Sequence, residues 1–353
     1  MPADARAPLR FGLIGCGRIG ISADERFARW ENARAWIPYS HLTAMQATPE
    51  LTVAAVCDVN PAALAEAQRR ADVPHAYADY REMIAHEALD GFAIATHAQH
   101  RHELIESAVG AGVRGLYCEK PLCTSLEQAD AIVELLESRR VQIVYGTRRR
   151  FMAAFLRART ALDEGEIGPL QSIIVTYPRS RLLWDHPHSV DLLQFFSGDA
   201  APVWIDARAE EDPAGDLFLT FAVLQFATGC TGYIVQGQGY DVSLHGPNGI
   251  LHVKGDGWAL EHRRPVDPTR DYGIHLAQDM DAPAASESGT VTGFRALCGA
   301  MRGQASRYRI EWARRNMEIL FACAESARSG AAVRWPVSRR GVELTGLTAA
   351  PVR

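Results

Sequence analysis

Long apolar runs and an excess of positive charge are both missing from this chain of 353 residues, and each absence excludes a class of protein. No apolar run approaches the roughly 18 residues needed to span a bilayer, and the first ten residues lack the apolar core of a signal peptide. Lys and Arg number 37 against 42 Asp and Glu, which gives a net charge of -5 and no basic field for nucleic acid or an anionic membrane. The sequence therefore predicts a cytoplasmic protein whose partner is a small molecule, not nucleic acid and not a membrane.

Cysteine is present, but not in an arrangement that predicts disulfides or metal. The seven cysteines are an odd number, and no C-x-x-C pair or His/Cys cluster at zinc spacing occurs. Most lie in apolar runs, as reduced and buried thiols do: Cys16, Cys57, Cys118, Cys230 and Cys323. The histidines of THAQHRH, at His97, His100 and His102, have no carboxylate or thiol set to complete a ligand group. No metal site is predicted.

The stretch from Phe11 to Gly20, FGLIGCGRIG, is the strongest feature that is present. An apolar run ends in Gly15, Gly17 and Gly20, the G-x-G-x-x-G spacing that opens a βαβ unit. One glycine makes the tight turn, one lets backbone approach a pyrophosphate, and one lets the next helix pack close to the strand. The helix N-terminus then offers free N–H groups to the phosphates. This context favours dinucleotide binding over a merely structural turn.

A second apolar strand, Leu51–Cys57, ends at Asp58. An acid at this place can accept hydrogen bonds from the adenosine ribose hydroxyls and repels a 2′-phosphate, so NAD is expected and NADP is disfavoured. The separation from Gly20 is longer than usual because of an excursion from Ser22 to Ser40 that is rich in aromatics. Those aromatics either pack on the domain or form a flap beside the cofactor, and packing is the favoured interpretation.

Strands alternate with helices up to the strand Val141–Tyr145, which predicts a doubly wound parallel sheet. Strand-like runs separated by Gly, Asn and Pro turns then follow from about Leu170 to Val253, as in an antiparallel meander. We expect an α/β protein with an NAD-binding domain over residues 1–147 and a substrate and oligomerisation domain over 148–353.

Several segments together resemble the Gfo/Idh/MocA family of glucose-fructose oxidoreductase and inositol dehydrogenase-like enzymes. They are GLIGCGRIG, the acid of AVCD, YCEKP, YGTRRRF, HSVD and the C-terminal RNMEILFACAESARSGAAVRWP. The resemblance implies an N-terminal Rossmann domain and a C-terminal α/β domain with an open, mainly antiparallel sheet that joins subunits in a homo-oligomer. It also implies reversible hydride transfer between NAD(P) and the carbinol carbon of a sugar, cyclitol or sugar derivative.

Lys120 and His188 are the expected catalytic pair. Lys120 follows a parallel strand, where an open α/β sheet places ligands, and can hydrogen-bond a substrate hydroxyl. The resemblance implies a cis Lys120-Pro121 bond, and His188 would take the hydroxyl proton. The residues expected to contact the cofactor are Gly15, Gly17, Arg18, Ile19, Gly20, Asp58, Thr96, Glu119 and Lys120.

The chain departs from the family pattern D-x-G-x-H ahead of the histidine. Trp184 stands where the family has aspartate, and Asp185 comes one place later. Either Asp185 reaches the same space, or Asp191, three residues after His188 on one helix face, takes the third polar role, or the substrate differs from simple cyclitols. Asp191 is preferred over Asp185.

The leading functional hypothesis is therefore an NAD-dependent sugar or cyclitol dehydrogenase. The alternatives are an NADPH-linked keto-sugar reductase, an NAD-dependent glycosidase that oxidises its substrate transiently, and a catalytically silent dinucleotide-binding regulatory protein. The displaced aspartate keeps the silent protein under consideration.

Overall fold

The computed structural model describes residues 7–30, 33–73, 75–265, 275–280 and 287–337, and these divide into two compact units. The first unit holds the chain up to Arg148 and takes in Glu287–Glu311 as well. The second holds Arg149–Ser286 and continues from Trp312. The expected division into 1–147 and 148–353 stays a prediction about domains, and the structure adds the return of Glu287–Glu311 to the first unit.

The first unit is built on a six-stranded sheet in the order β3-β2-β1-β4-β5-β6, with all neighbouring strands parallel. This is the strand order of a Rossmann fold, whose crevice lies where the order reverses beside β1. The predicted doubly wound sheet is confirmed. Its strands are β1 (Leu9–Ile14), β2 (Leu51–Cys57), β3 (Ala76–Tyr77), β4 (Gly91–Ile94), β5 (Gly115–Cys118) and β6 (Gln142–Tyr145).

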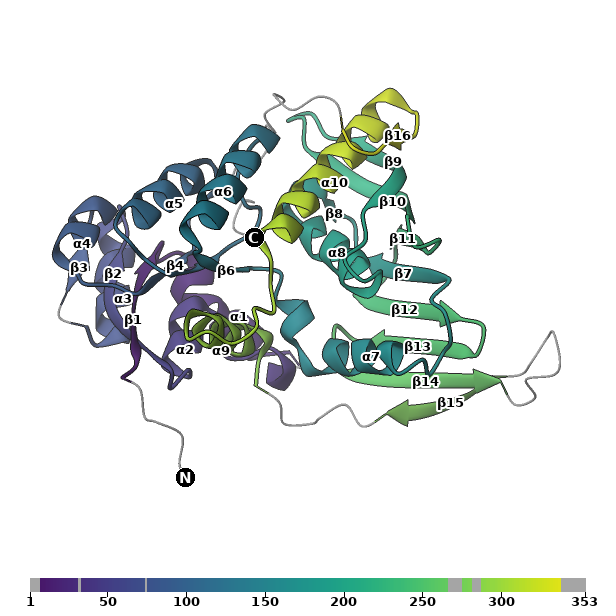
Figure 1. Ribbon diagram of the computed structural model, residues 1–353, viewed down its shortest axis with the longest axis horizontal. Coiled ribbons are helices and arrows are strands. Elements are labelled where there is room, and N and C mark those ends of the chain that lie inside the picture. The colour runs from purple at the N-terminus through teal and green to yellow at the C-terminus, as the bar shows by residue number, and fades with distance from the viewer. Residues whose placement is uncertain (1–6, 31–32, 74, 266–274, 281–286, 338–353) are drawn as a thin grey trace. The chain divides into compact units, whose positions relative to one another are not determined.

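Helices cover both faces of this sheet (Figure 1). α2 and α9 pack together on one face, and α5 and α6 pack together on the other. α9 was not predicted; it is fixed by Phe294, whose ring stacks on Tyr117 of β5 at 4.3 Å between centroids. The helices are α1 (Ala23–Phe27), α2 (His41–Gln46), α3 (Pro61–Ala71), α4 (Tyr80–His86), α5 (Arg101–Gly110), α6 (Leu126–Arg139) and α9 (Gly289–Met301).

The second unit is built on a ten-stranded mixed sheet, which confirms the mainly antiparallel expectation. The order is β15-β14-β13-β12-β7-β11-β10-β9-β16, with β8 also paired to β10, and only β7 and β11 run parallel among the described pairs. The strands are β7 (Ser172–Tyr177), β8 (Ser180–Arg181), β9 (Pro202–Glu211), β10 (Leu217–Phe226), β11 (Thr231–Gln236), β12 (Asp241–Gly246), β13 (Gly249–Lys254), β14 (Ala259–Pro265), β15 (His275–Met280) and β16 (Val333–Arg334).

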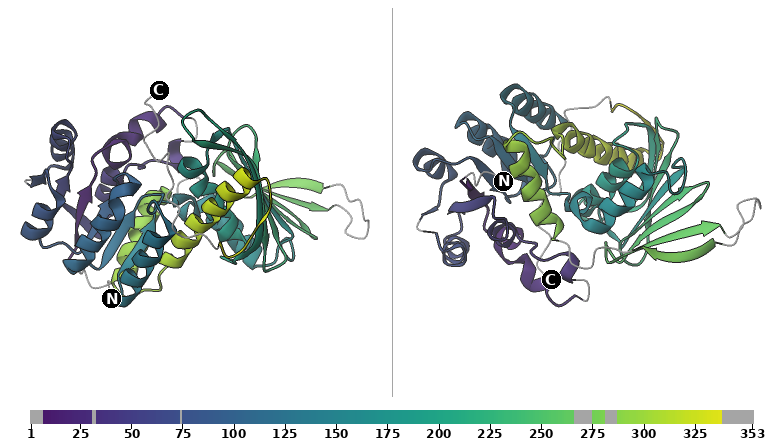
Figure 2. Two further views of the ribbon diagram at one scale, coloured as in Figure 1. Left: turned by 90° about the horizontal axis from the view of Figure 1, so that it is seen from above. Right: turned by 60° about the horizontal axis from the view of Figure 1, so that its bottom comes forward.

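Three helices, α7 (Ala153–Asp163), α8 (Leu182–Phe196) and α10 (Ile310–Ser329), lie along one face of this sheet (Figure 2). Strand side chains alternate accordingly: Ile173 and Val175 of β7 are fully buried, whereas Ile174 between them is half-buried on the opposite face. The sequence did not predict α7. Within the described residues, no helix has the length and apolar character needed to cross a membrane.

Candidate active site

The glycine turn after β1 has the geometry that the motif predicts. Gly15 has φ +94°, and a Cβ there would lie 2.8 Å from the Ala95 carbonyl carbon at the end of β4. A Cβ on Gly20 would collide with the Gly15 carbonyl oxygen, so close packing requires glycine there. A Cβ on Gly17 would meet nothing within 4 Å. The open space beside Gly17 is what close backbone approach to a pyrophosphate requires.

Asp58 lies beside this turn. Its Oδ2 accepts a 2.6 Å hydrogen bond from the Cys16 N–H, and its Oδ1 accepts a 2.8 Å bond from the Asn60 N–H. The side chain is half-buried, and each carboxylate oxygen can accept a further hydrogen bond. The Asp58 side chain is thus fixed at the carboxyl end of β2, where its oxygens can accept hydrogen bonds from the two hydroxyls of a ribose.

Arg18 and Ile19 follow the turn in a π-helical segment, Arg18–Ser22, that leads into α1. Arg18 is exposed and Ile19 half-buried. Thr96, just beyond β4, is half-buried, and its backbone N would be 2.9 Å from a Cβ on Gly15. The structure therefore brings the glycine turn, Asp58 and Thr96 together at the carboxyl ends of β1, β2 and β4.

Lys120 lies two residues beyond the end of β5 and is half-buried. The Lys120-Pro121 peptide bond is cis, as expected. Arg101 of α5 holds the backbone on both sides, because its guanidinium donates to the carbonyl oxygens of Glu119 (2.6 Å) and Pro121. It also donates to the Thr96 carbonyl. Arg101, which the sequence reasoning missed, ties together two segments that were predicted to contact the cofactor.

Glu119 was predicted to contact the cofactor, but its carboxylate is buried and bonded within the protein. Its Oε1 is 3.1 Å from Nε2 of His41, a fully buried residue at the start of α2. Its Oε2 accepts from the Lys120 N–H at 3.2 Å. The backbone of Gly146 passes so close that a Cβ there would lie 2.9 Å from the Glu119 carboxyl.

The excursion from Ser22 to Ser40 packs on the first unit. Asp24 accepts hydrogen bonds from the N–H groups of Tyr39 (2.7 Å) and Ser40 (2.9 Å). The Arg148 guanidinium carbon lies 4.2 Å from the ring centroid of Trp36 and 4.0 Å from that of Tyr39. Trp36 is buried. These contacts favour the packing interpretation; residues 31 and 32 of the excursion lie outside the described residues.

In the second unit, α8 carries His188, Asp191 and Asp185. The helix begins at Leu182 and includes Pro187. A buried side chain of α10, Asn316, donates a 2.8 Å hydrogen bond to the Pro187 carbonyl. His188 and Asp191 are buried, and Asp185 is half-buried.

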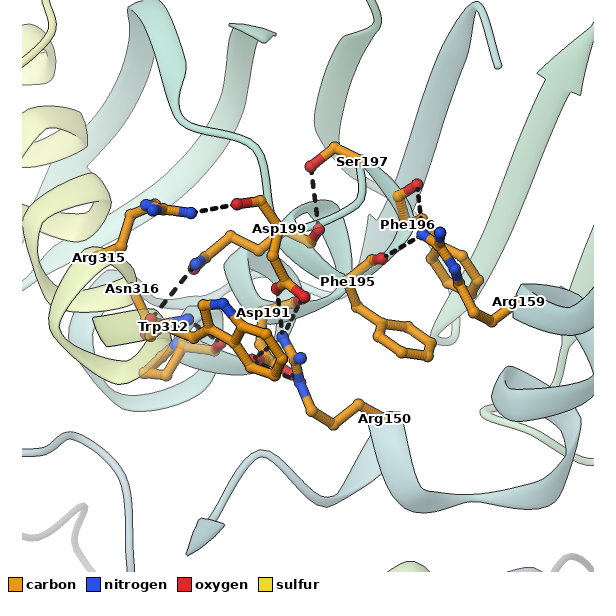
Figure 3. Close-up of polar contacts among 12 residues, drawn as sticks. Arg150, Arg159, Asp191, Phe195, Phe196, Ser197, Asp199, Trp312, Arg315 and Asn316 are labelled. Atoms are coloured by element: carbon orange, nitrogen blue, oxygen red, sulfur yellow. Dashed lines mark hydrogen bonds and ion pairs between the residues drawn. The ribbon is translucent and has the colours of Figure 1, made fainter. Parts of the chain in front are cut away.

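Asp191 forms a buried ion pair with Arg150, the centre of Figure 3. Arg150 Nη2 lies 2.8 Å from Asp191 Oδ1 and Nε lies 2.9 Å from Oδ2, a bidentate arrangement. Nη2 also lies 3.2 Å from Asp199 Oδ1. The guanidinium lies near the rings of Phe195 and Trp312. Asp191 therefore anchors α8 one turn after His188.

Arg149, the preceding residue, centres a second buried cluster. Its Nε and Nη2 donate to the Asp256 carboxylate at 2.6 and 2.7 Å, and its guanidinium lies 3.8 Å from the Tyr240 ring centroid. The Tyr240 and Tyr177 rings meet edge to face at 4.7 Å. Burial raises the pKa of Tyr177, and the negative charge of Asp185 raises it further. Asp185 thus lies near this cluster. In the sequence, the only signal of the cluster is the run of three arginines at 148–150.

Among the described residues, no group of three or more His, Cys, Asp or Glu side chains could hold a metal. His102 is half-buried and lies 3.7 Å from Glu106, one turn further along α5.

Comparison with known proteins agrees with this architecture. Residues 9–147 match the family model of the GFO_IDH_MocA oxidoreductases, described as having an NAD-binding Rossmann fold. Inositol 2-dehydrogenase of Rhizobium meliloti is 28% identical over 287 residues, 73% of this chain and 77% of that protein. Myo-inositol 2-dehydrogenase of Thermotoga maritima is 25% identical, over 69% of this chain and 74% of that protein. Over residues 9–147 the chain is thus similar to the NAD-binding domain of the GFO_IDH_MocA oxidoreductases.

Solved structures extend the likeness in fold to the second unit. Levoglucosan dehydrogenase, in complex with NADH and levoglucosan, has a TM-score of 0.75 at 19% identity and covers 94% of this chain and 100% of its own. Scyllo-inositol dehydrogenase of Lactobacillus casei, with bound NAD(H) and scyllo-inositol, has a TM-score of 0.72 at 17% identity and covers 93% and 99%. At these identities the structural likeness concerns the fold alone.

Proposed function

We propose that this oxidoreductase is an NAD-dependent dehydrogenase that acts on a hydroxyl-bearing carbon of a sugar, cyclitol or sugar derivative. The observation that carries the proposal is the glycine turn with Asp58 at the crevice of a Rossmann sheet, in a chain whose relatives include inositol 2-dehydrogenases. The carboxylate of Asp58 supports NAD over NADP because it would repel a 2′-phosphate. The NADPH-linked reductase is therefore the weaker alternative.

Each predicted group has a role in this proposal. The turn residues from Gly15 to Gly20 would hold the pyrophosphate, and Asp58 the ribose. NAD bound there would supply the acceptor for the hydride of the substrate carbon. His188 accepts the hydroxyl proton, and Lys120 positions that oxygen and stabilises its developing negative charge. Lys120 belongs to the first unit and His188 to the second.

The third polar role remains a choice between Asp185 and Asp191. The bidentate Arg150 pair supports an anchoring role for Asp191, since an ionised carboxylate held by guanidinium is a poor proton acceptor. The half-buried Asp185 is the better candidate for contact with substrate, which reverses the preference drawn from the sequence.

The test is a screen for turnover with NAD, in which the absorbance of NADH reports the reaction. The panel includes myo-inositol, scyllo-inositol, levoglucosan, D-apiose, uronates and nucleotide sugars. Turnover of at least one polyol or sugar with NAD supports the proposal. Tight NAD binding without turnover of any compound would favour the silent dinucleotide-binding protein, the second candidate that the Trp184 substitution keeps open.

We also propose that the open face of the second sheet joins two copies of the chain in the cytoplasm. That face carries half-buried apolar side chains that alternate with the helix-facing core: Ile174, Val223, Tyr233, Val235 and Ile250. Sedimentation of Tyr233→Lys should give a smaller species than the unmodified chain; equal size would refute this interface.

The cytoplasmic location is supported by the cysteines. All seven are buried and unpaired, in keeping with a reducing compartment.

A further inference from the structure

A buried histidine-carboxylate pair includes Glu119, the residue that precedes Lys120. His41 is fully buried and Glu119 nearly so, and their side chains meet at 3.1 Å. The two residues are 78 positions apart, on α2 and just after β5. The pair connects the end of the Ser22–Ser40 excursion to the lysine that we place in catalysis.

The surroundings fix the carboxylate of Glu119 in position. The backbone N–H of Lys120 donates to Oε2 at 3.2 Å, and Arg101 binds the Glu119 carbonyl at 2.6 Å. Gly146 leaves room for the carboxyl, since a Cβ there would lie 2.9 Å from it. The carboxylate therefore cannot turn out to solvent without breaking its hydrogen bonds to His41 and to the Lys120 N–H.

The carboxyl of Glu119 is ionised in spite of its burial. Burial alone raises its pKa, but the hydrogen bond from His41 and the positive charges of Lys120 and Arg101 outweigh burial and hold the pKa below its ordinary value. An ionised carboxylate only accepts hydrogen bonds, so His41 Nε2 must carry the hydrogen. Because the interaction is mutual, the carboxylate favours the charged form of Lys120 in return.

Other titratable groups face this site from the elements packed around it. Burial raises the pKa of Tyr117 and of Cys118 in β5, and the negative charge of Glu119 raises each pKa further. Arg148 and Tyr39 act on Tyr117 from the excursion side, the arginine lowering its pKa. Glu119 is the one acid that acts electrostatically on both of these β5 side chains.

We propose that His41 and Glu119 form a positioning pair for Lys120: His41 holds the buried carboxylate of Glu119 against the backbone N–H of Lys120, and the negative charge kept there favours the protonated form of the lysine side chain. The catalytic importance of this device rests on the proposed function, whereas the electrostatic coupling itself does not. His41 and Glu119 are positioning residues, since they act through Lys120.

The chain offers an unusually clean measurement, because its only lysines are Lys120 and Lys254. Brief acetylation with acetic anhydride at a series of pH values, read by mass spectrometry, gives a titration midpoint for each lysine. In Glu119→Gln the Lys120 midpoint should fall by about one pH unit, because a neighbouring opposite charge is lost. Lys120 should then react about tenfold faster below both midpoints. Lys254, which is paired with Glu261, is the internal standard and should not change.

Variants of His41 test the other half of the pair. His41→Leu leaves Glu119 without its donor, so the carboxyl should take up a proton and the Lys120 midpoint should fall in the same direction. His41→Gln, whose amide can donate in place of Nε2, should restore most of the shift. The double variant Glu119→Gln/His41→Leu should shift no further than Glu119→Gln alone.

Glu87→Gln is the matched control. Glu87 is likewise buried and paired with a histidine, His75, in the same unit, and it also binds Arg10 and Tyr77. Its replacement should leave the Lys120 midpoint unchanged. A Lys120 midpoint in Glu119→Gln equal to that of the unmodified protein would overturn the proposal. A shift of this midpoint in Glu119→Gln but not in His41→Leu would show that His41 has no part in it.

The acetylation needs no substrate, so its outcome is separate from that of the turnover screen. Folding of each variant is checked by its circular dichroism spectrum and its melting temperature. Where a substrate is found, the alkaline limb of kcat/KM should move with the Lys120 midpoint, whereas a purely structural role would lower activity without moving that limb. Turnover with an unmoved limb would overturn the inference and leave the proposed function standing.

Discussion

The two units differ in how the sequence determines where their predicted site residues lie. In the first, the glycine turn, Asp58, Thr96 and Lys120 all follow parallel strands, and those strands end at one edge of the sheet. In the second, His188 lies on a helix whose position depends on Arg150 and on a side chain of α10, 41 and 129 residues from their partners. Strand topology brings the first set to one edge of the sheet, where contacts such as those of Arg101 then fix it, whereas the helix of the second set is itself held by long-range polar pairs.

Removal of one catalytic group from each unit should have the largest effect and would most directly test this comparison. Lys120→Met and His188→Asn should each lower kcat by about 10² to 10⁴, the usual worth of a positioned proton-transfer group. Steady-state kinetics with the substrate from the screen measures this. The effect of the double variant should be much smaller than the product of the two, since the groups act as a unit.

NAD affinity, measured by fluorescence titration, is the control for these variants and should survive both. Full multiplicativity would mean that the two side chains act on separate steps. Turnover that both single variants retain would refute the proposed chemistry.

The Arg150 pair should dominate the stability of the second unit. Arg150→Met leaves Asp191 buried without its bidentate partner, and loss of one member of a buried pair costs about 3 to 5 kcal/mol. Asp191→Asn should cost less, because Arg150 keeps Asp199 as an acceptor. Thermal unfolding compares the two. Equal losses would show that Asp199 contributes nothing to the pair.

Acid should destabilise the second unit through His186. Burial lowers the pKa of this imidazole to about 3, so the unfolded chain binds a proton below about pH 6.5 that the folded chain does not. The stability that neutral His186 provides is complete above that pH and is lost as the pH falls, by about 1.4 kcal/mol per unit. Between pH 7 and pH 5 the melting temperature of His186→Gln should therefore fall less than that of the unmodified protein. An equal fall would exclude His186 as the cause; His102→Gln, at a half-buried site, is the control.

Cofactor preference tests the first unit on its own. Asp58→Ser removes the acceptor for the ribose hydroxyls and the repulsion of a 2′-phosphate, so NAD affinity should fall by about tenfold and the NAD/NADP preference should narrow. Titration with both cofactors measures the change. Equal affinities for NAD and NADP in the unmodified protein would contradict the assignment of Asp58.

What the sequence could predict follows the same division. The strands of the first sheet and the positions of Gly15, Asp58 and Lys120 followed from local patterns and βαβ topology. His41 and Arg101 were missed, because a lone histidine or arginine gives no signal of a partner that only the folded sheet brings near. In the second unit the meander was recognisable from its turns, but α7 was not, and the roles of Arg149 and Arg150 depend on partners elsewhere in the chain.

The excursion from Ser22 to Ser40 supplies the smallest expected effect and the finest test of the packing interpretation. The Arg148 guanidinium lies close to the rings of both Trp36 and Tyr39, and a cation–π contact of this kind contributes about 1 kcal/mol. Arg148→Met keeps most of the apolar stem, so it should lower the melting temperature slightly and leave KM unchanged. Arg69→Met, which removes an exposed arginine from α3 of the same unit, is the control for loss of charge. A change in KM with no loss of stability in Arg148→Met would instead favour a flap beside the cofactor, because a segment that only packs on the domain affects folding before it affects binding.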